Sequence, residues 1–313
     1  MEFNHTPVLL EECIQGLNIK ENGIYVDGTI GGAGHSLKII NNLNSEGLLI
    51  GIDRDKEALE VAKKRLVGFK NFRLVHNNHD NILTILEELE ISKVDGILLD
   101  LGVSSYQLDE KNRGFSYTKE ANLDMRMDKS QNLDAKYVVN KYPEKELANL
   151  IYEYGEEKFS RRIARRICEL RKEKEIETTL ELVKIIESVV PRNKLDGHPA
   201  KRTFQAIRIE VNDELKPLYN TTINSIKALK PEGRLCIITF HSLEDRIVKR
   251  AMQDASGKCV CPPGLPNCVC GAKDYGNIIT KKPILPTDKE MQENSRSKSA
   301  KLRIFERNNK EFE

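Results

Sequence analysis

The chain has 313 residues, enough to bury a sizeable core in two domains or in one domain with an insertion. Charged residues make up 31% of it, yet the formal net charge is only +2, so any site for a polyanion must be a local patch. No apolar run reaches the length of a membrane span, and residues 1–10 lack a signal-peptide pattern. Seven cysteines without an export signal indicate reduced thiols, so we expect a cytoplasmic protein with no membrane partner.

The first third of the chain alternates short apolar runs with segments of helical spacing. The runs predicted as strands are Ile24–Val26, Leu48–Ile52, Phe72–Val75 and Val94–Leu101. This alternation predicts a parallel sheet covered by helices on both faces. In such sheets, ligands bind at the carboxyl ends of the strands.

The pattern changes after Gly102. From there to about residue 208 no strand is predicted, and three apolar helical faces follow one another, the third opened by a capping box at Thr178-x-x-Glu181. We then expect a helix over 215–229, a turn over 230–233 and a strand over 234–240. Residues 283–300 read as loop, and 301–306 as a final edge strand.

A glycine-rich turn follows the first predicted strand. Its glycines are Gly28, Gly31, Gly32 and Gly34, spaced G-x-x-G-G-x-G, and glycine lets a nucleotide-like ligand approach bare backbone. Asp53 follows the next strand, about 20 residues on, where an acid can accept hydrogen bonds from ribose hydroxyls. Asp27 adds an anion that repels a pyrophosphate but suits a cationic amino-acid group, which favours S-adenosylmethionine over NAD. The alternative is a tight structural turn.

Three further residues follow strands and are candidates for chemistry. Asp100 ends the fourth strand and can accept a hydrogen bond or a proton from the substrate; the alternative is a turn or helix-capping aspartate. Gln107, in the same loop, is a candidate donor to the cofactor or a plain surface residue. His241 follows the later strand and is either a proton carrier or a structural histidine.

Two basic patches are candidate RNA contacts. Arg162, Arg165 and Arg166 have the spacing of one helix face, and Lys201 and Arg208 are predicted on the outer face of a later helix. Arginine clusters bind phosphates in a bidentate manner. The alternative is a solvated helix face whose charge is offset by nearby glutamates.

Four cysteines lie close together near the C-terminus, at Cys259, Cys261, Cys268 and Cys270. Four thiolates with proline turns between them can enclose one tetrahedral zinc ion. The spacing is C-x-C and not the commoner C-x-x-C, so reduced surface thiols remain the alternative to a structural zinc.

Taken together, these stretches resemble the bacterial methyltransferases that modify the N4 atom of a cytosine in 16S ribosomal RNA. The resemblance covers nearly the whole chain. Its landmarks are H-T-P-V-L-L-E-E at His5–Glu12, D-G-T-I-G-G-A-G-H-S at Asp27–Ser36, G-I-D-R-D at Gly51–Asp55, D-G-I-L-L-D-L-G-V-S-S at Asp95–Ser105, R-G-F-S at Arg113–Ser116, L-D-M-R-M-D at Leu123–Asp128, H-P-A-K-R-T-F-Q-A-I-R-I-E-V-N at His198–Asn212 and F-H-S-L-E-D-R at Phe240–Arg246.

The resemblance implies a Rossmann-like class I methyltransferase sheet over residues 1–108 and 209–313, with an all-helical insertion over 109–208 that recognises RNA. It implies S-adenosylmethionine as donor and 16S rRNA of the small ribosomal subunit as partner, with no obligatory protein partner evident. The cofactor contacts that it implies are Ala33, Gly34, His35, Asp53, His79, Asp100 and Gln107. The family often has an aromatic residue where His79 stands; His79 can stack on adenine, or Asp80 beside it can accept the adenine amino group.

The implied reaction is methyl transfer to cytosine N4, a poor nucleophile because its lone pair is delocalised into the ring. Catalysis therefore needs positioning and an acceptor for the N4 proton, such as Asp100. The loop after Asp100 reads L-G-V-S-S and lacks the S/N/D-P-P-Y/F signature of DNA amino-methylating enzymes. The competing hypotheses are a ribosome-assembly factor that binds RNA and holds the cofactor without turnover, and a methyltransferase acting on DNA or protein.

Overall fold

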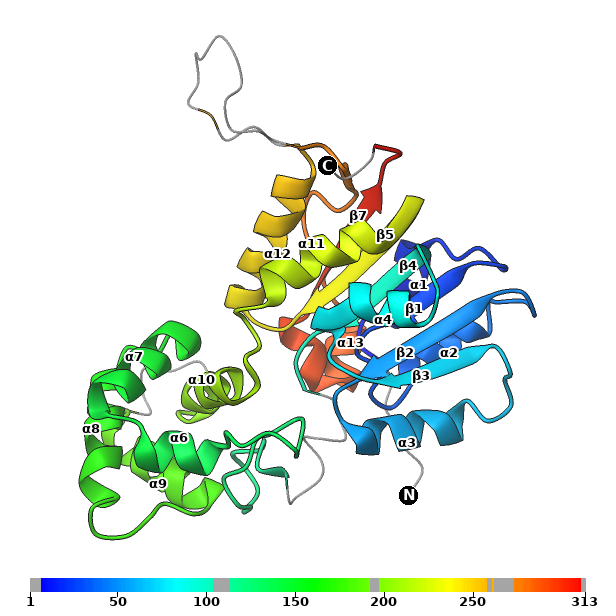
Figure 1. Ribbon diagram of the computed structural model, residues 1–313. Helices are drawn as coiled ribbons and strands as arrows, with labels where there is room; N and C mark the ends of the chain where they lie inside the picture. The colour runs from blue at the N-terminus through cyan, green and yellow to red at the C-terminus, as the bar shows by residue number, and fades with distance from the viewer. Residues whose placement is uncertain (1–6, 104–112, 192–196, 258–260, 262–272, 311–313) are drawn as a thin grey trace. The chain divides into compact units, whose positions relative to one another are not determined.

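The computed structural model describes residues 7–103, 113–191, 197–257, 261 and 273–310 (Figure 1). The chain divides into two compact units. One unit, which we call the sheet unit, comprises Met1–Gly102 and Leu215–Glu313, and the other, the helical unit, comprises Val103–Glu214. The helical unit is thus inserted in sequence between two halves of the sheet unit.

The sheet unit is built on seven strands in the order β3-β2-β1-β4-β5-β7-β6. Pairing is parallel from β3 through β5 and antiparallel between β5 and β7 and between β7 and β6. The strands are β1 (Ile24–Asp27), β2 (Leu48–Asp53), β3 (Phe72–His76), β4 (Val94–Asp100), β5 (Leu229–Thr239), β6 (Gly276–Ile278) and β7 (Lys301–Arg307). All four strands predicted in the first third are confirmed.

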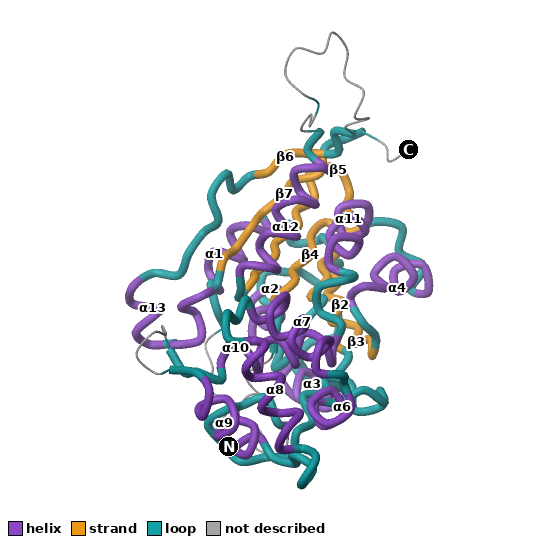
Figure 2. Tube along the Cα trace, turned by 90° about the vertical axis from the view of Figure 1, so that its left-hand side faces the viewer, coloured by secondary structure: helices purple, strands orange, loops and turns teal. Residues whose placement is uncertain are grey.

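Helices cover both faces of this sheet (Figures 1 and 2). Buried residues of the first three helices form one hydrophobic cluster with the central strands, whereas α4, α11 and α12 pack together on the opposite face. The helices are α1 (Leu10–Leu17), α2 (Gly34–Ile40), α3 (Lys56–Arg65), α4 (Ile82–Glu88), α11 (Leu218–Ala228), α12 (Ser242–Ala255) and α13 (Asp288–Glu293), with short 3-10 turns η1 (His79–Asn81) and η4 (Ser295–Ser299). The result is the predicted α/β, Rossmann-like architecture.

The predicted turn at 230–233 is wrong. Strand β5 begins at Leu229 and runs through this stretch. Val94 of β4 pairs with Leu229, but Gly96 pairs with Arg234, so the intervening residues of β5 bulge out of the ladder. A bulge absorbs the glycine and proline that suggest a turn in the sequence, because the extra residues are left unpaired while the strand continues.

The C-terminal region differs from the prediction in two ways. Strand β7 is present, but it is not an edge strand, since it pairs with β5 on one side and with β6 on the other. The stretch predicted as loop contains α13 and η4. One carboxylate of α13, that of Glu290, accepts a hydrogen bond from the Leu9 backbone N–H at 2.8 Å, which ties this stretch to the start of α1.

The helical unit contains five described helices around its own core. They are α6 (Ala135–Lys141), α7 (Glu144–Gly155), α8 (Ser160–Leu170), α9 (Thr179–Val189) and α10 (Lys201–Asn212). Their apolar faces meet in one cluster that includes Leu147, Ile163, Ile186 and Phe204. The capping box of Thr178 and Glu181 opens α9 as predicted. Within the described part of this unit, extended pairing is limited to one isolated bridge, between Asn122 and Thr178.

None of the described helices combines the length and hydropathy that a membrane crossing needs.

Candidate functional site

The glycine turn joins β1 to α2 and is shaped by close packing. The Gly28 N–H donates to Leu98 O at 2.9 Å, and a Cβ at Gly28 would lie 2.4 Å from the Leu99 side chain. A larger residue would therefore push the turn away from β4. Ala33, the residue before α2, has a left-handed backbone with φ 58°. Gly32 and Gly34 are partly exposed, whereas Gly31 and Ala33 are buried. Glycine without a Cβ allows close approach of a ligand at the two partly exposed positions.

Asp27 does not act as an exposed anion in this turn. Its side chain is buried, and its two oxygens accept hydrogen bonds from Ser36 Oγ at 2.6 Å and from the Thr29 N–H at 3.2 Å. Burial raises the pKa of this carboxyl to about 6. Asp27 therefore stabilises the turn through buried hydrogen bonds. Our sequence argument for a cationic ligand, which relied on an exposed Asp27, is not supported at this residue.

Asp53 ends β2 beside the turn and is half-buried. Its carboxylate accepts from the Gly31 N–H at 2.9 Å and from the Asp55 N–H at 2.8 Å. Burial raises its pKa to about 6, against the lowering effect of these two hydrogen bonds. Each carboxylate oxygen has two lone pairs, so one acceptor position on each oxygen remains for a diol such as that of ribose.

His79 lies on the other side of the turn, in η1 directly after β3. A Cβ at Gly28 would approach its Cβ to 3.1 Å, so the histidine lies against the turn. Burial lowers its pKa to about 4, and the ring is neutral at pH 7. A neutral, flat ring suits stacking on an adenine. Asp80 is less suited to accept the adenine amino group, because its oxygens already accept from Thr221 Oγ1 and Asn78 Nδ2, both at 2.6 Å.

Asp100 ends β4 next to the same turn. Its backbone N–H donates to Thr29 Oγ1 at 2.7 Å. One of its carboxyl oxygens, Oδ1, is buried and has no hydrogen-bond partner among the described residues. Burial, followed by the nearby charges of Asp27 and Glu244, raises its pKa to about 8. An unsatisfied buried carboxyl is costly, so this oxygen is a candidate for contact with a ligand.

His35 in α2 faces Asp100. Its Nε2 lies 3.0 Å from Val8 O, and its Nδ1 lies 3.8 Å from Asp100 Oδ2. Burial lowers the pKa of His35 to about 4, so the ring is neutral. Pro7 and Val8 pack on this helix start, and a Cβ at Gly34 would meet Pro7 Cγ at 2.4 Å. Sequence reasoning missed the contact between Val8 O and His35. Val8 lies in the His5–Glu12 landmark, which was the available signal for it.

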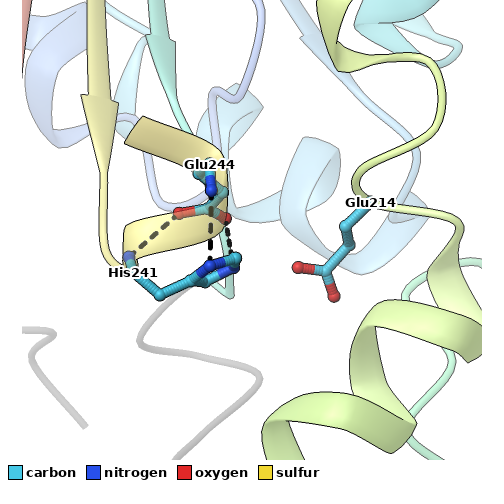
Figure 3. Close-up of side chains that lie close together, drawn as sticks. All are labelled: Glu214, His241 and Glu244. Atoms are coloured by element: carbon cyan, nitrogen blue, oxygen red, sulfur yellow. Dashed lines mark hydrogen bonds and ion pairs between the residues drawn. The ribbon is translucent and has the colours of Figure 1, made fainter. Parts of the chain in front are cut away.

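His241 has a structural task at the start of α12 (Figure 3). Its Nδ1 accepts from the Glu244 N–H at 3.4 Å, and Glu244 Oε2 accepts in return from the His241 backbone N–H at 3.3 Å, which forms a reciprocal capping box. Histidine is an unusual residue for this position, where serine, threonine, aspartate and asparagine dominate. The structure therefore supports the structural interpretation of His241, and its role in proton transfer stays a prediction.

Several candidate residues lie outside the described part of the chain. They are Gln107, Cys259, Cys268 and Cys270. Cys261 is described, but one thiol does not define a zinc site, so the zinc site stays a prediction.

The arginines of α8 lie on the exposed side of that helix. Arg162 lies over the Phe159 ring at 5.8 Å, Arg165 is 3.9 Å from Glu144, and Arg166 is 3.2 Å from Glu169. Exposed ion pairs of this kind contribute little free energy, so these guanidinium groups can exchange their carboxylate partners for phosphates.

Lys201 and Arg208 of α10 are not equivalent. Lys201 is exposed at the first turn. Arg208 is half-buried and forms a bidentate pair with Glu214, at 2.9 and 2.8 Å. Its planar guanidinium is therefore already bound to a carboxylate, and it is a poorer candidate for RNA contact than Lys201.

The turn, Asp53, His79, Asp100 and His35 thus come together at the carboxyl ends of β1, β2, β3 and β4. This is where an α/β sheet of this kind binds its ligand. The residues fit a nucleoside-like cofactor: a glycine turn, a carboxylate with free acceptor positions, a neutral ring and a buried carboxyl oxygen with no partner among the described residues.

Comparison with known proteins identifies the family. Residues 2–308 match the model of the MraW methylase family. The "Ribosomal RNA small subunit methyltransferase H" of Clostridium botulinum (strain Kyoto / Type A2) is 59% identical over 305 residues, covering 97% of this chain and 99% of that protein. The protein of the same name from Lachnospira eligens is 56% identical over 310 residues, covering 98% of each. The chain therefore belongs to the MraW methylase family.

Proposed function

We propose that this protein transfers the methyl group of S-adenosylmethionine to N4 of a cytosine in the decoding region of 16S rRNA, acting on the small ribosomal subunit in the cytoplasm. The names of its relatives support ribosomal RNA of the small subunit as the substrate. The choice of cytosine N4 follows from the sequence resemblance. The structural observation that carries the proposal is the carboxyl of Asp100 beside the glycine turn, one oxygen of which is buried and has no partner among the described residues.

The residues around the turn fit the cofactor. The backbone of Ala33, Gly34 and His35 would receive its amino-acid end, Asp53 its ribose and His79 its adenine. When bound, the cofactor supplies an electrophilic methyl group on a sulfonium. Gln107, which follows β4 in the sequence, is a further proposed contact with the cofactor.

The protein must supply position and a proton acceptor, because the N4 lone pair is delocalised into the ring. As the new N–C bond forms, N4 becomes positively charged and must lose a proton. Asp100 in its ionised form accepts that proton. The cytosine must also be unstacked from its neighbours to reach a buried carboxyl, as in other enzymes that modify bases.

The helical unit is proposed to recognise the RNA, with the insertion predicted over 109–208 and the structural unit spanning Val103–Glu214. Its candidate contacts are the exposed arginines of α8 and Lys201 of α10. Because the net charge of the whole chain is only +2, such a local patch is needed to bind a polyanion.

The test is turnover with a methyl-labelled donor on unmethylated small subunits, free 16S rRNA and duplex DNA, followed by nucleoside analysis of the product. We expect label in N4-methylcytidine from the small subunit and none in DNA. Label in another nucleoside would contradict the N4 assignment. Binding of both cofactor and subunit without turnover would favour an assembly factor instead.

The matched variants are Asp100→Asn and Glu11→Gln. Glu11 is an exposed acid that pairs with Lys38 at 3.0 Å, so its amide variant controls for loss of one carboxylate. We expect Asp100→Asn to lower the rate constant for methyl transfer by at least about 100-fold, the usual contribution of a general base, and Glu11→Gln to leave it unchanged. An Asp100→Asn variant that binds the cofactor and methylates at the normal rate would remove Asp100 from the mechanism.

A further inference from the structure

The surroundings of Asp100 disfavour its ionised form in the free protein. His35 Nε2 lies 3.0 Å from a carbonyl oxygen, Val8 O, and a carbonyl can only accept, so the proton of the neutral ring is on Nε2. His35 Nδ1 therefore presents a lone pair toward Asp100 Oδ2, 3.8 Å away. A carboxylate oxygen at this distance receives no hydrogen bond from His35 and repels this lone pair, whereas a protonated carboxyl carries no negative charge to repel it.

The titratable groups packed around Asp100 act in the same direction. Asp27 from β1 and Glu244 from α12 are buried acids, and both disfavour a second negative charge at Asp100. Cys13 from α1 is a buried thiol whose pKa is raised, chiefly by burial, so it is neutral and offers Asp100 no positive charge. With Oδ1 buried and unpartnered among the described residues, the carboxylate form lacks the hydrogen bonds that normally stabilise it.

We propose that Asp100 is a neutral acid in the free protein and releases its proton to solvent when the positively charged methyl donor binds, so that this residue distinguishes the donor from its uncharged product. The inference rests on the proposed function, because it takes the ligand to be S-adenosylmethionine. It adds a charge-based selectivity that methyl transfer by itself does not require.

The reaction then conserves charge at the site. Binding brings in a sulfonium and expels one proton, which leaves a cation beside the Asp100 carboxylate. During transfer the S–CH₃ bond breaks with its electron pair going to sulfur, the N4–CH₃ bond forms, and the N4 proton passes to Asp100. The product complex holds a neutral thioether and a neutral acid, so Asp100 is left in its free-protein state. S-adenosylhomocysteine can leave without any proton uptake.

The test is calorimetric titration of the whole protein at pH 7, in two buffers with different ionisation enthalpies, which counts protons released on binding. With the pKa of Asp100 raised to about 8, most free molecules carry the proton at this pH. We expect close to one proton released per S-adenosylmethionine bound and close to none for S-adenosylhomocysteine. Sinefungin, which has an ammonium group near the sulfonium position, should behave like the donor.

A second readout is the pH dependence of affinity. The donor binds the ionised form, so its affinity should rise nearly tenfold as the pH rises by one unit toward about 8, and then level off. The affinity for S-adenosylhomocysteine should stay nearly flat over this range. Asp27 and Asp53, whose pKa values are about 6, are mostly ionised already at pH 7 and contribute little there.

Asp100→Asn should abolish the difference in proton release between donor and product, and Glu11→Gln should preserve it. Equal proton release with all three ligands, or release that survives in Asp100→Asn, would overturn the inference while leaving the proposed methylation intact. Failure of the wild-type protein to bind the donor at all would instead overturn the proposed function. Proton release with the three ligands on the wild-type protein tests the inference even if Asp100→Asn does not fold.

Discussion

Asp27, Asp53 and Asp100 occupy the same kind of position, the last residue of a parallel strand, yet their partners separate their roles. Asp27 is enclosed by Ser36 and Thr29 and supports the turn. Asp53 is held by two backbone N–H groups with acceptor positions to spare. Asp100 alone of the three has a buried oxygen without a described partner. The environment of each carboxyl, and not its position at a strand end, determines its chemistry.

The pH dependence of stability provides a prediction at this scale. The pKa of Asp100 is raised in the folded protein to about 8, above its value of 3.8 in the unfolded chain. Folding therefore favours the protonated form, and the stability from this group is fully present below about pH 4 and is lost as the pH rises to about 8. An asparagine at 100 does not ionise and avoids the loss.

The melting temperature of Asp100→Asn relative to wild type should thus rise between pH 5 and pH 8, by about 2–4 °C per pH unit, and stay constant above that range. Thermal unfolding of both proteins in parallel without cofactor measures it, and Glu11→Gln should show no such trend. A constant difference between Asp100→Asn and wild type across this range would show that Asp100 titrates normally.

The kind of contact that each site residue makes determines whether it could be predicted from the sequence. Asp53 and Asp100 were identified because strand ends at one edge of a parallel sheet must lie together. The burial of Asp27 was not, because it depends on a hydroxyl nine residues away that folds back over the carboxyl. The hydrogen bond between His35 and Val8 O joins two segments whose proximity no periodicity in the sequence reveals.

At the scale of elements, variants of His241 can show whether this N-cap residue of α12 also takes part in catalysis. His241→Ala should destabilise the protein by about 1 kcal/mol through loss of the cap of α12, and His241→Asn should restore most of that loss, because asparagine is a strong N-cap residue. Methylation by His241→Asn should be near the wild-type rate. Unfolding by denaturant and a turnover assay measure the two effects. A stable His241→Asn protein without activity would instead make the imidazole catalytic.

Helix α8 gives a prediction about RNA binding. Replacing Arg162, Arg165 and Arg166 together by alanine should weaken binding to small subunits at least about tenfold. The dependence of log affinity on log salt should become shallower by about 2, since three phosphate contacts are lost. Filter binding at several salt concentrations measures both quantities.

The control removes the same charge from another part of the helical unit. Lys136, Lys141 and Lys174 pair with Glu175 and Glu181 at 3.2, 2.9 and 2.8 Å. Their triple alanine variant should bind RNA like wild type. Equal weakening by the two triple variants would mean that net charge, and not the α8 surface, governs binding.

The elements that the sequence pattern predicted are those with a clear period or a run of apolar residues. The first four strands and the capped start of α9 are of this kind. The errors lie where pairing overrides local signals. Pro231 and Gly233 suggest a turn but sit in a bulge of β5, and α13 lacks the apolar stripe that marks a helix, since none of its residues is buried.

At the scale of the whole molecule, each unit has its own hydrophobic cluster. We expect two transitions in scanning calorimetry. S-adenosylmethionine at about 100 times its dissociation constant should stabilise the sheet unit by about 2.7 kcal/mol and leave the other transition nearly unmoved. Asp53→Ala, which removes the proposed ribose contact, should reduce this shift. A single transition that moves as a whole would show that the two units unfold together.

The neighbouring positions of β4 and β5 have a consequence for how the chain reaches its native state. Asp100 pairs with Ile238, although the entire helical unit lies between them in sequence. Closing so long a loop costs entropy, and each doubling of its length adds about 0.6 kcal/mol. If the inserted helices collapse first through their local contacts, the effective loop shortens to the connections on either side. The order of events during synthesis favours this route, because the insertion leaves the ribosome before β5 does. We therefore expect the centre of the sheet to close late, with β5 pairing with β4 only after the helical unit has formed.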